Sequence, residues 1–244
     1  MPIRANALVV MAKAPIPGAV KTRLVPFLSI DEAAELARAL LIDQLSHLKA
    51  ISTADLYLAF TPQETAALMH ELAPPEFALF SQTHGDLGAR MQNIFANLFA
   101  KGHKYIVLIG ADLPPVPLGY FTQAFIHLHG KKSPFHPPFV KGERGGFDGP
   151  QQRVVLGPSR DGGYYLIGLN RQVPEIFTDM RWSHDQVFAQ TLVKLRALTV
   201  PTLELPQWFD VDTPADLKAL AQDRTAPYRN QMKNTSKVLD RVKI

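Results

Sequence analysis

The segment at residues 105–115 reads YIVLIGADLPP and gives the clearest indication of the fold. Its first part, Tyr105–Gly110, is continuously apolar, which is typical of a central parallel strand that is covered on both faces. Asp112 follows at the end of this strand. Pro114 keeps Leu113 extended, so the chain leaves the strand without entering a helix directly. The segment therefore predicts a buried strand with a carboxylate in the loop behind its carboxyl end.

Strand-like and helix-like segments alternate on both sides of that strand. Apolar strand-like runs occur at residues 7–12, 54–60, 77–82, 154–159, 162–169 and 198–205. Helical patterns begin at Ser29, which forms a capping box with Glu32, and at Pro62, and they cover residues 85–102, 118–129, 185–196 and 212–222. This alternation predicts an α/β fold, with an open, mostly parallel, Rossmann-like sheet and helices on both faces. Ligands bind such sheets outside the carboxyl ends of the strands, so the loops that follow strands are the candidate site loops.

Length and composition limit the class of protein. The chain has 244 residues, of which 46% are apolar and 20% charged, as in a globular protein. No apolar run approaches the ~18–20 residues of a membrane span, so no transmembrane segment is expected. The absence of cysteine excludes disulfides, thiolate zinc sites, iron–sulfur clusters and a cysteine nucleophile. We expect a cytoplasmic protein.

We expect one domain over residues 1–223, with an insert at about residues 131–150 and a basic tail at residues 224–244. The tail carries six basic side chains and one acid, whereas the rest of the chain is close to neutral. We interpret the tail as solvated, with nucleic-acid or membrane contact as the alternative, and we expect no nucleic-acid partner. The insert contains eight Pro or Gly and no period, which indicates a mobile insert or an extra loop; a lid over the site is the alternative.

The loop after the first strand, AKAPIPGAVKTRL at residues 12–24, combines a glycine with cations. Gly18 lets a phosphate approach the backbone closely, and Lys21 and Arg23 can neutralise its charge. The P-loop spacing GxxxxGK[ST] is excluded, because proline and valine stand where its two glycines are needed. The loop indicates polyphosphate binding of another kind, and a basic surface turn is the alternative.

Two acidic loops contain candidate ligands for Mg²⁺ (or Mn²⁺). Asp112 suits this ion, which takes one or two protein carboxylates, several waters and substrate phosphates; capping of the following turn is the alternative. In FDVDTPADL, residues 209–217, Asp210 and Asp212 alternate with apolar residues and so point to the same side of an extended segment. Thr213 as an N-cap explains the start of a helix but neither acid. A second oxygen ligand for the same ion would explain them.

The turn Asp161-Gly162-Gly163 comes before a strand-like segment. A hairpin turn explains it fully. In the functional interpretation, the glycine backbone approaches a sugar or an acceptor, and Asp161 hydrogen-bonds a hydroxyl or acts as a base.

The loop SQTHGDLGARM, residues 81–91, follows the third strand. Gln82 can read the edge of a base, while Gly85 and Gly88 allow close packing on a planar ring. Asp86 as the N-cap of a helix is the alternative interpretation.

Taken together, these loops resemble those of the GT-A superfamily of nucleotide-diphospho-sugar transferases. More narrowly, the chain resembles a bacterial group of GT-A-like proteins that was formerly labelled a domain of unknown function and is often called transferase 1. The similarity lies in the segments KAPIPGAVKTRL, GDLGARM, GADLPP, DGGYYLIGL, WSHDQVF and FDVDTPADL, which follow in this order over nearly the whole chain. The same residues are similar to a guanylyltransferase that activates phospholactate and to molybdenum-cofactor nucleotidyltransferases. His184 departs from the group, where we expect threonine, and we interpret it as a surface histidine at a helix start.

The resemblance implies a GT-A form of the sheet and a set of roles for the loops. Lys21 and Arg23 would hold phosphates and, with Asp161, are the candidate catalytic residues. Asp112 and Asp212 would bind the metal. The acceptor or sugar would face Asp161, Gly162 and Gly163. The implied nucleotide-binding residues are Ala12, Lys13, Gly18, Lys21, Arg23, Gln82, Gly85, Asp86, Gly88 and Arg90.

The expected function is a Mg²⁺-dependent transferase that acts on a nucleotide-diphospho-sugar and a small-molecule acceptor. The alternative is a nucleotidyltransferase that couples an NTP to a phosphorylated small molecule and releases pyrophosphate. Only the first reaction needs a base on the acceptor hydroxyl, because a phosphate nucleophile is already anionic. A second alternative is a non-catalytic nucleotide-binding domain, which would not need Asp112 and Asp212 together.

Overall fold

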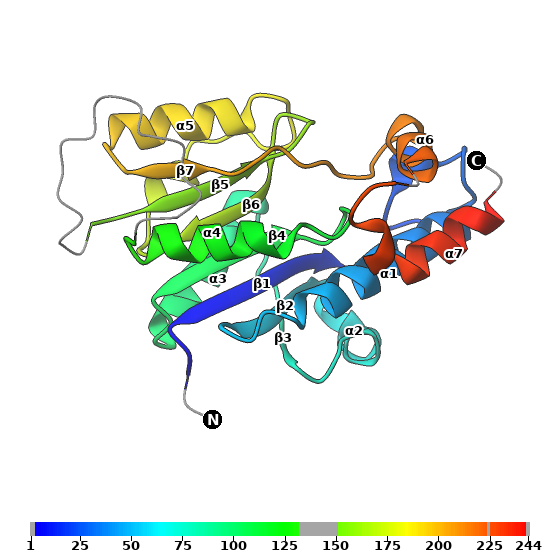
Figure 1. Cartoon of the computed structure of the whole chain (residues 1–244), viewed down its shortest axis with the longest axis horizontal. Coiled ribbons are helices and arrows are strands. Elements are labelled where there is room, and N and C mark those ends of the chain that lie inside the picture. The colour runs from blue at the N-terminus through cyan, green and yellow to red at the C-terminus, as the bar shows by residue number, and fades with distance from the viewer. Residues whose placement is uncertain (1–2, 132–150, 224, 243–244) are drawn as a thin grey trace.

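The computed structural model describes residues 3–131, 151–223 and 225–242. They form a seven-stranded sheet in the order β3-β2-β1-β4-β6-β5-β7 (Figure 1). Each strand runs parallel to its neighbours except β6, which is antiparallel to β4 and β5. The strands are β1 (Asn6–Lys13), β2 (Asp55–Thr61), β3 (Phe77–Ser81), β4 (Tyr105–Gly110), β5 (Val154–Pro158), β6 (Tyr164–Leu169) and β7 (Thr202–Glu204). The predicted open, mostly parallel sheet is confirmed.

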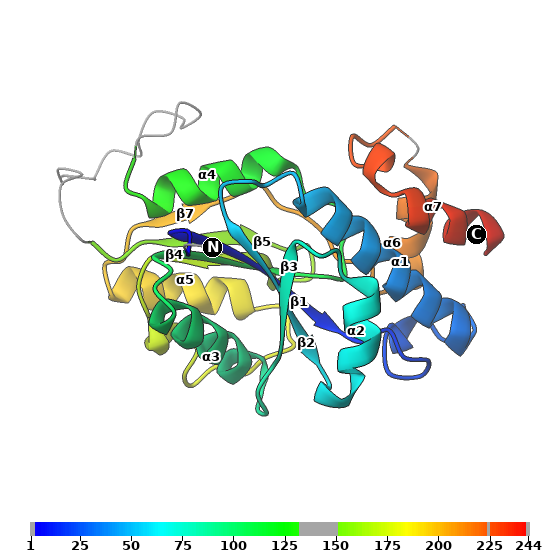
Figure 2. The same ribbon diagram turned by 90° about the horizontal axis from the view of Figure 1, so that it is seen from below.

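Helices cover both faces of the sheet (Figure 2). Helices α1, α2 and α4 pack on one face and α3 and α5 on the other, while α6 and α7 pack on the outer side of α1. The helices are α1 (Ile30–Leu48), α2 (Ala66–Leu72), α3 (Leu87–Ala100), α4 (Leu118–Leu128), α5 (Val187–Ala197), α6 (Pro214–Gln222) and α7 (Lys233–Arg241). Within the three described ranges, no helix combines the length and the apolar character needed to cross a membrane.

Strand β4 lies in the middle of the sheet, as its sequence predicts. Its residues Ile106, Val107, Leu108 and Ile109 are each at most 1% exposed. Val107 and Ile109 face the layer of α1 and α4, whereas Ile106 and Leu108 face the layer of α3 and α5. Because successive side chains of a strand point to opposite faces, an unbroken apolar run is stable only where both faces are covered.

The helix starts that the sequence marked at Ser29 and Thr213 are capped as expected. Ser29 accepts a hydrogen bond from the backbone of Glu32 in a full capping box, and Thr213 forms the same box with Asp216. The prediction that a helix begins at Pro62 is wrong. Pro62 is extended, with ψ at 164°, and a short 3₁₀ turn separates it from the start of α2.

The C-terminal segment is folded onto α1, which corrects its interpretation as a solvated tail. Helix α7 lies beside α1 (Figure 1), and Val238 and Leu239 are buried against it. Asp43 of α1 accepts hydrogen bonds from the backbone and side chains of Asn234 and Thr235 at the start of α7. The prediction relied on the net positive charge of the segment. Net charge does not depend on the spacing of the apolar residues, and this spacing is what indicates an amphipathic helix. The insert predicted at residues 131–150 lies outside the described residues from 132 onward.

Candidate active site

A cavity of about 420 Å³ lies at the carboxyl edge of the sheet. The loops after β1, β4, β5 and β7, together with the segment that leads into α5, supply its charged wall. This is the edge of the sheet at which the topology predicts a ligand. Its ionisable wall residues are Arg23, Asp112, Asp161, Tyr164, His184, Asp185, Asp210 and Asp212. Five of them are aspartates, so the cavity is strongly acidic.

Asp112 and Asp212, the two predicted metal ligands, meet around Lys21. The Lys21 ammonium nitrogen lies 3.0 Å from Oδ1 of Asp112 and 3.0 Å from Oδ1 of Asp212. It also donates to the backbone oxygen of Asp112 at 3.4 Å. The backbone N–H of Val211 donates to that same oxygen at 3.0 Å, so the two acidic loops are joined directly. Residues 100 positions apart thus form one cluster.

Lys21 is held tightly in this cluster. Its side chain is 2% exposed, whereas those of Asp112 and Asp212 are 58% and 39% exposed. Burial alone would lower the pKa of the Lys21 ammonium, but the two carboxylates outweigh burial and raise this pKa above its ordinary value. Its backbone is left-handed, with φ at 49°, a conformation that costs a non-glycine residue energy and persists only where the surroundings enforce it.

Asp210 is a deeper acid of the same loop. Phe209 and Val211 are buried while Asp210 and Asp212 reach the cavity, so the alternation predicted for this segment is confirmed. The hydroxyl of Ser159 donates a short hydrogen bond to Asp210. Burial, together with the nearby charges of Asp161 and Asp212, raises the pKa of Asp210 to about 6, although the Ser159 bond opposes the shift.

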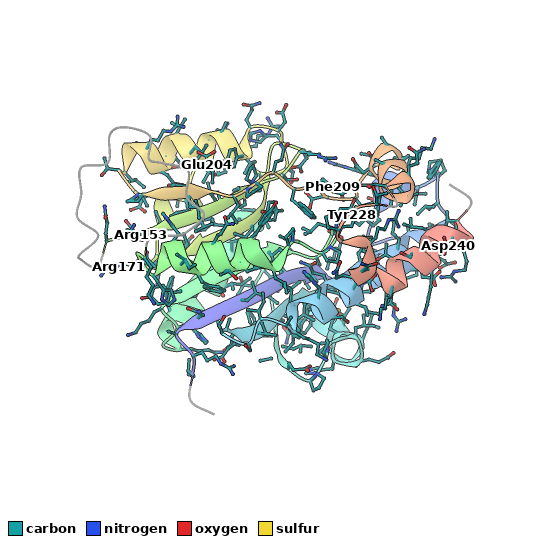
Figure 3. All side chains as sticks on the ribbon, viewed as in Figure 1. Arg153, Arg171, Glu204, Phe209, Tyr228 and Asp240 are labelled. Carbon is teal, nitrogen blue, oxygen red and sulfur yellow. The ribbon has the colours of Figure 1, made fainter. Side chains whose placement is uncertain are left out.

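Aromatic packing supports the Asp210 loop from behind. The rings of Phe209 and Tyr228 lie 6.0 Å apart, and the guanidinium of Arg160 sits 4.6 Å above the Phe209 ring. Figure 3 shows Phe209 and Tyr228 close together near α6 and α7, with Arg153 and Arg171 at the opposite end of the molecule. The C-terminal segment therefore supports a loop of the cavity.

The Asp161-Gly162-Gly163 turn joins β5 to the antiparallel β6, so its interpretation as a hairpin turn is confirmed. Oδ1 of Asp161 accepts a hydrogen bond from the Gly163 N–H at 2.9 Å. Gly162 has φ at +86°, and a Cβ built there would come within 2.0 Å of the Asp185 backbone oxygen. The chain's own residue Asp185 therefore makes the close approach at Gly162. Contact with an acceptor stays a prediction for Asp161 and Gly163, which line the cavity.

The loop at residues 81–91 has mainly structural contacts. Asp86 caps α3 by accepting from the backbone of Ala89, so its alternative interpretation is confirmed. Nε2 of Gln82 donates to one backbone oxygen of β1 and one of β2. The Arg90 guanidinium donates to the backbone oxygen of Gly85. A planar ring does pack on Gly88, but it is the indole of Trp182, which a Cβ would meet at 2.5 Å.

Of the predicted nucleotide-binding residues, only Arg23 and Lys21 lie at the cavity or directly behind its wall, as the described residues define it. Arg23 lines the cavity, whereas Lys21 lies behind the two aspartates that line it. The other members are absent from the cavity wall as the described residues define it, and their role stays a prediction: Ala12, Lys13, Gly18, Gln82, Gly85, Asp86, Gly88 and Arg90.

Several wall residues were missed as site residues, namely Tyr164, Trp182, Asp185 and Asp210. For Asp210 a signal existed, because it shares its side of the segment with Asp212. Trp182 and Asp185 stand in the WSHDQVF segment, whose order marks the family but not a cavity wall. His184 does lie at a helix start, where Nδ1 accepts from the N–H of Gln186, and it also lines the cavity.

The donor chemistry of the cavity fits a magnesium-like cation. No group of three or more His, Asp or Glu side chains within residues 3–131, 151–223 and 225–242 is arranged to hold a metal alone. Mg²⁺ does not need one, because it is held by one or two carboxylates with waters and substrate phosphates. Oδ2 of Asp112 and Oδ2 of Asp212 accept no hydrogen bond from the described residues and are available to a cation.

A family model described as "Uncharacterized protein conserved in bacteria (DUF2064)" matches residues 44–184. The chain belongs to this family. The matched region includes Asp112 and Asp161 but ends before Asp212. No curated protein matches the sequence.

Among solved structures, the chain is similar to a protein from Desulfovibrio desulfuricans G20 described as a "putative nucleotide-diphospho-sugar transferase". They share 28% identity and a TM-score of 0.79, over 98% of this chain and 99% of the other. Two more distant likenesses concern the fold alone. Rv0371c of Mycobacterium tuberculosis H37Rv has a TM-score of 0.50 and 18% identity, over 90% of this chain and 98% of the other. The 4-diphosphocytidyl-2C-methyl-D-erythritol synthase of Anaerococcus prevotii DSM 20548 has a TM-score of 0.52 and 8% identity, over 87% of this chain and 93% of the other.

Proposed function

We propose that this protein is a divalent-cation-dependent transferase that acts on a nucleotide-diphospho-sugar. The observation that carries the proposal is the meeting of Asp112 and Asp212 at the carboxyl edge of the sheet, with Arg23 on the wall of the same cavity. The similarity to the Desulfovibrio protein, over nearly the full length of both chains, supports the choice of substrate class.

The charge of the cavity explains why a divalent cation is needed. Five aspartates and one arginine line it, and the single ammonium of Lys21 lies behind two of the aspartates. A diphosphate is itself an anion, and like charges at close range repel strongly in a partly buried site. Asp112 and Asp212 would hold a cation whose charge would reverse the sign of that interaction locally.

The chain's own residues divide the remaining work. Asp112 and Asp212 would hold the cation, which when bound stabilises negative charge on the departing diphosphate. Arg23, exposed at the cavity, would bind a phosphate oxygen through its fork of N–H donors. Asp161, whose Oδ1 is fixed by the Gly163 N–H, would take the proton from the acceptor hydroxyl as that oxygen bonds to the sugar. The bond between the sugar and the diphosphate breaks, and the nucleoside diphosphate leaves.

A ligand panel on the full chain tests the proposal. The first step measures thermal stabilisation by nucleoside triphosphates and nucleotide-sugars, each with and without Mg²⁺ or Mn²⁺. The second measures release of nucleoside diphosphate from the nucleotide-sugar that stabilises best. We expect metal-dependent stabilisation and a release that is lost in both Asp112→Ala and Asp212→Ala. Asp240→Ala, an exposed acid on α7 away from the cavity (Figure 3), is the matched control.

Two results would contradict the proposal, each in a distinct way. Release of pyrophosphate from an NTP in the presence of a phosphorylated acceptor identifies a nucleotidyltransferase. Stabilisation by nucleotides that needs no metal, with no turnover of any substrate, identifies a non-catalytic nucleotide-binding domain.

A further inference from the structure

The ammonium group of Lys21 is already paired within the chain and is not free to bind a phosphate. Its three contacts within 3.4 Å are all to the chain itself: one oxygen of each of two carboxylates and one backbone oxygen. Two of these contacts are hydrogen bonds, to the backbone oxygen of Asp112 and to Oδ1 of Asp212, and the third is the ion pair with Oδ1 of Asp112. The side chain is almost fully buried and is absent from the described cavity wall, whereas Arg23, two residues later, lies on it.

The same contacts change what the two aspartates can bind. Asp112 and Asp212 alone would present two negative charges to a cation. Together with the positive charge of the Lys21 ammonium, their net charge is only minus one. A divalent ion held by the same two carboxylates would also lie close to a fixed positive charge. The aspartates keep their Oδ2 atoms available, so the ammonium weakens the site without blocking it.

We propose that Lys21 is a built-in cation that keeps the Asp112–Asp212 pair a weak site for a free divalent ion, so that the ion is retained only together with the phosphates of the nucleotide. The inference rests on the proposed function, because it assumes that this pair holds the ion. The phosphates supply the negative charge that Lys21 cancels. Lys21 is therefore a positioning residue that sets the order of binding, and Arg23 is the cation that touches the substrate.

A purely structural role for Lys21 predicts the opposite sign. If the ammonium only held the two acidic loops together, its removal would let Asp112 and Asp212 separate, and the divalent ion would bind more weakly. If it sets the order of binding, its removal leaves two uncompensated carboxylates, and the free ion binds more tightly.

The test measures Mn²⁺ binding to the full chain without nucleotide, from the paramagnetic resonance signal of free Mn²⁺. We expect Lys21→Met to bind Mn²⁺ at least about tenfold more tightly than the natural chain, because a nearby positive charge has been removed. Lys21→Arg keeps the charge and should stay within about threefold of the natural chain. Arg171→Met removes an exposed cation at the opposite end of the molecule (Figure 3), and should also stay within that range. Equal or weaker Mn²⁺ binding by Lys21→Met overturns the inference.

A second measurement decides the matter if Lys21→Met does not fold. The ammonium of Lys21 is buried, so in the natural chain it should give a slowly exchanging ¹H–¹⁵N signal, assigned by its absence in Lys21→Arg. This signal should persist in millimolar Mg²⁺ alone and change when Mg²⁺ and a nucleoside diphosphate are added together. Loss of the signal in Mg²⁺ alone overturns the inference.

The same samples separate this inference from the proposed function. The probes are UDP, GDP, CDP, ADP and dTDP, each with Mn²⁺. If none of them makes the natural chain retain Mn²⁺ beyond what the nucleotide binds by itself, the proposed function fails. If one does, but Lys21→Met without nucleotide binds Mn²⁺ no more tightly than the natural chain, only the inference fails.

Discussion

The molecule contains two carboxylate clusters that differ in how fully their oxygens are used. Asp43 of α1 is 1% exposed, and each of its oxygens accepts two hydrogen bonds from the start of α7, at 2.7 to 3.0 Å. Asp112 and Asp212 each use one oxygen for Lys21, and the other accepts no hydrogen bond from the described residues. Both clusters join segments far apart in the sequence.

This difference separates a structural acid from the two acids that we propose as cation ligands. Four donors satisfy the charge of Asp43 completely, so the cluster has no capacity for a ligand and serves to fix α7. The pair at the carboxyl edge is only half satisfied and is partly exposed to a cavity. Unused acceptor capacity, more than burial or charge alone, marks the site.

Neutralising an acid of the cavity pair tests the difference between the two clusters most directly. Asp112→Asn keeps the size of the side chain and should lower turnover about 1,000-fold, since it removes a ligand of the cation that stabilises the leaving group. The free energy of unfolding should fall by less than in Asp43→Ala, because Asp212 still pairs with the buried Lys21 ammonium. The measurement is release of nucleoside diphosphate at saturating metal, with urea unfolding in parallel. A large loss of stability would instead place Asp112 in the same class as Asp43.

Removing Asp43 should have the converse effect. Asp43→Ala leaves the buried donors of Thr235 without an acceptor and should lower the free energy of unfolding by about 3 kcal/mol. Urea unfolding measures it, with Asp31→Ala, an exposed acid near the start of the same helix, as the control. The folded fraction should keep its Mn²⁺ affinity. A variant as stable as the natural chain would show that α7 is held by apolar packing alone.

Asp210 is an intermediate case, because it is partly exposed at the cavity and has only Ser159 as a hydrogen-bond donor among the described residues. Its pKa in the folded chain is about 6, above the ordinary value of 3.8, so the folded state holds the proton more tightly than the unfolded state. The charged form therefore destabilises the fold, and this cost grows as the pH rises from about 4 to above 6. Asp210→Asn should raise the free energy of unfolding by about 2 kcal/mol above pH 7.

The stabilisation of Asp210→Asn relative to the natural chain should shrink toward zero as the pH falls to about 4. Unfolding curves of both chains over this range make the test. A pH-independent gain would mean that repacking, and not the charge, stabilises the variant.

A change in packing at a helical glycine should have a smaller effect than these changes in charge. Gly88→Ala places a methyl group against the Trp182 ring and should cost roughly 1 to 2 kcal/mol of stability. Gly119 occupies the matching second position of α4, and a Cβ there meets nothing within 4 Å, so Gly119→Ala should stabilise the chain by about 0.5–1 kcal/mol. Thermal unfolding measures both, and a shift in tryptophan fluorescence should accompany Gly88→Ala only. If both variants were stabilised to the same extent, the Trp182 ring would be shown to move aside from the added methyl group at no cost in stability.

Local patterns of the sequence predicted most of the fold. The apolar run of β4 and the capping box at Ser29 depend on neighbours within a few residues, and the structure has both where they were expected. Helix α7 was missed because its basic residues suggested a solvated tail, although its apolar positions fit one face of a helix.

The arrangement of the candidate site was predicted in part, for a physical reason. Strand topology places Asp112 and Asp212 at one edge of the sheet, and they do meet there. The position of Lys21 between them depends on a left-handed backbone and on burial, neither of which a local pattern reports. The contact of Gly88 with Trp182 joins residues that lie far apart in the chain, and only coordinates show which ring is involved.

The long separation between the members of the cavity cluster has a consequence during synthesis on the ribosome. Asp112 emerges about 100 residues before Asp212, and Lys21 about 190 residues before it. On their own, Lys21 and Asp112 form a neutral one-to-one ion pair. The unbalanced negative charge that would attract a divalent ion enters the cluster only when the last strand-to-helix loop joins it through the bond from Val211 to Asp112. A nascent chain that has not yet reached this loop can build most of the sheet and still lack an attractive place for the metal.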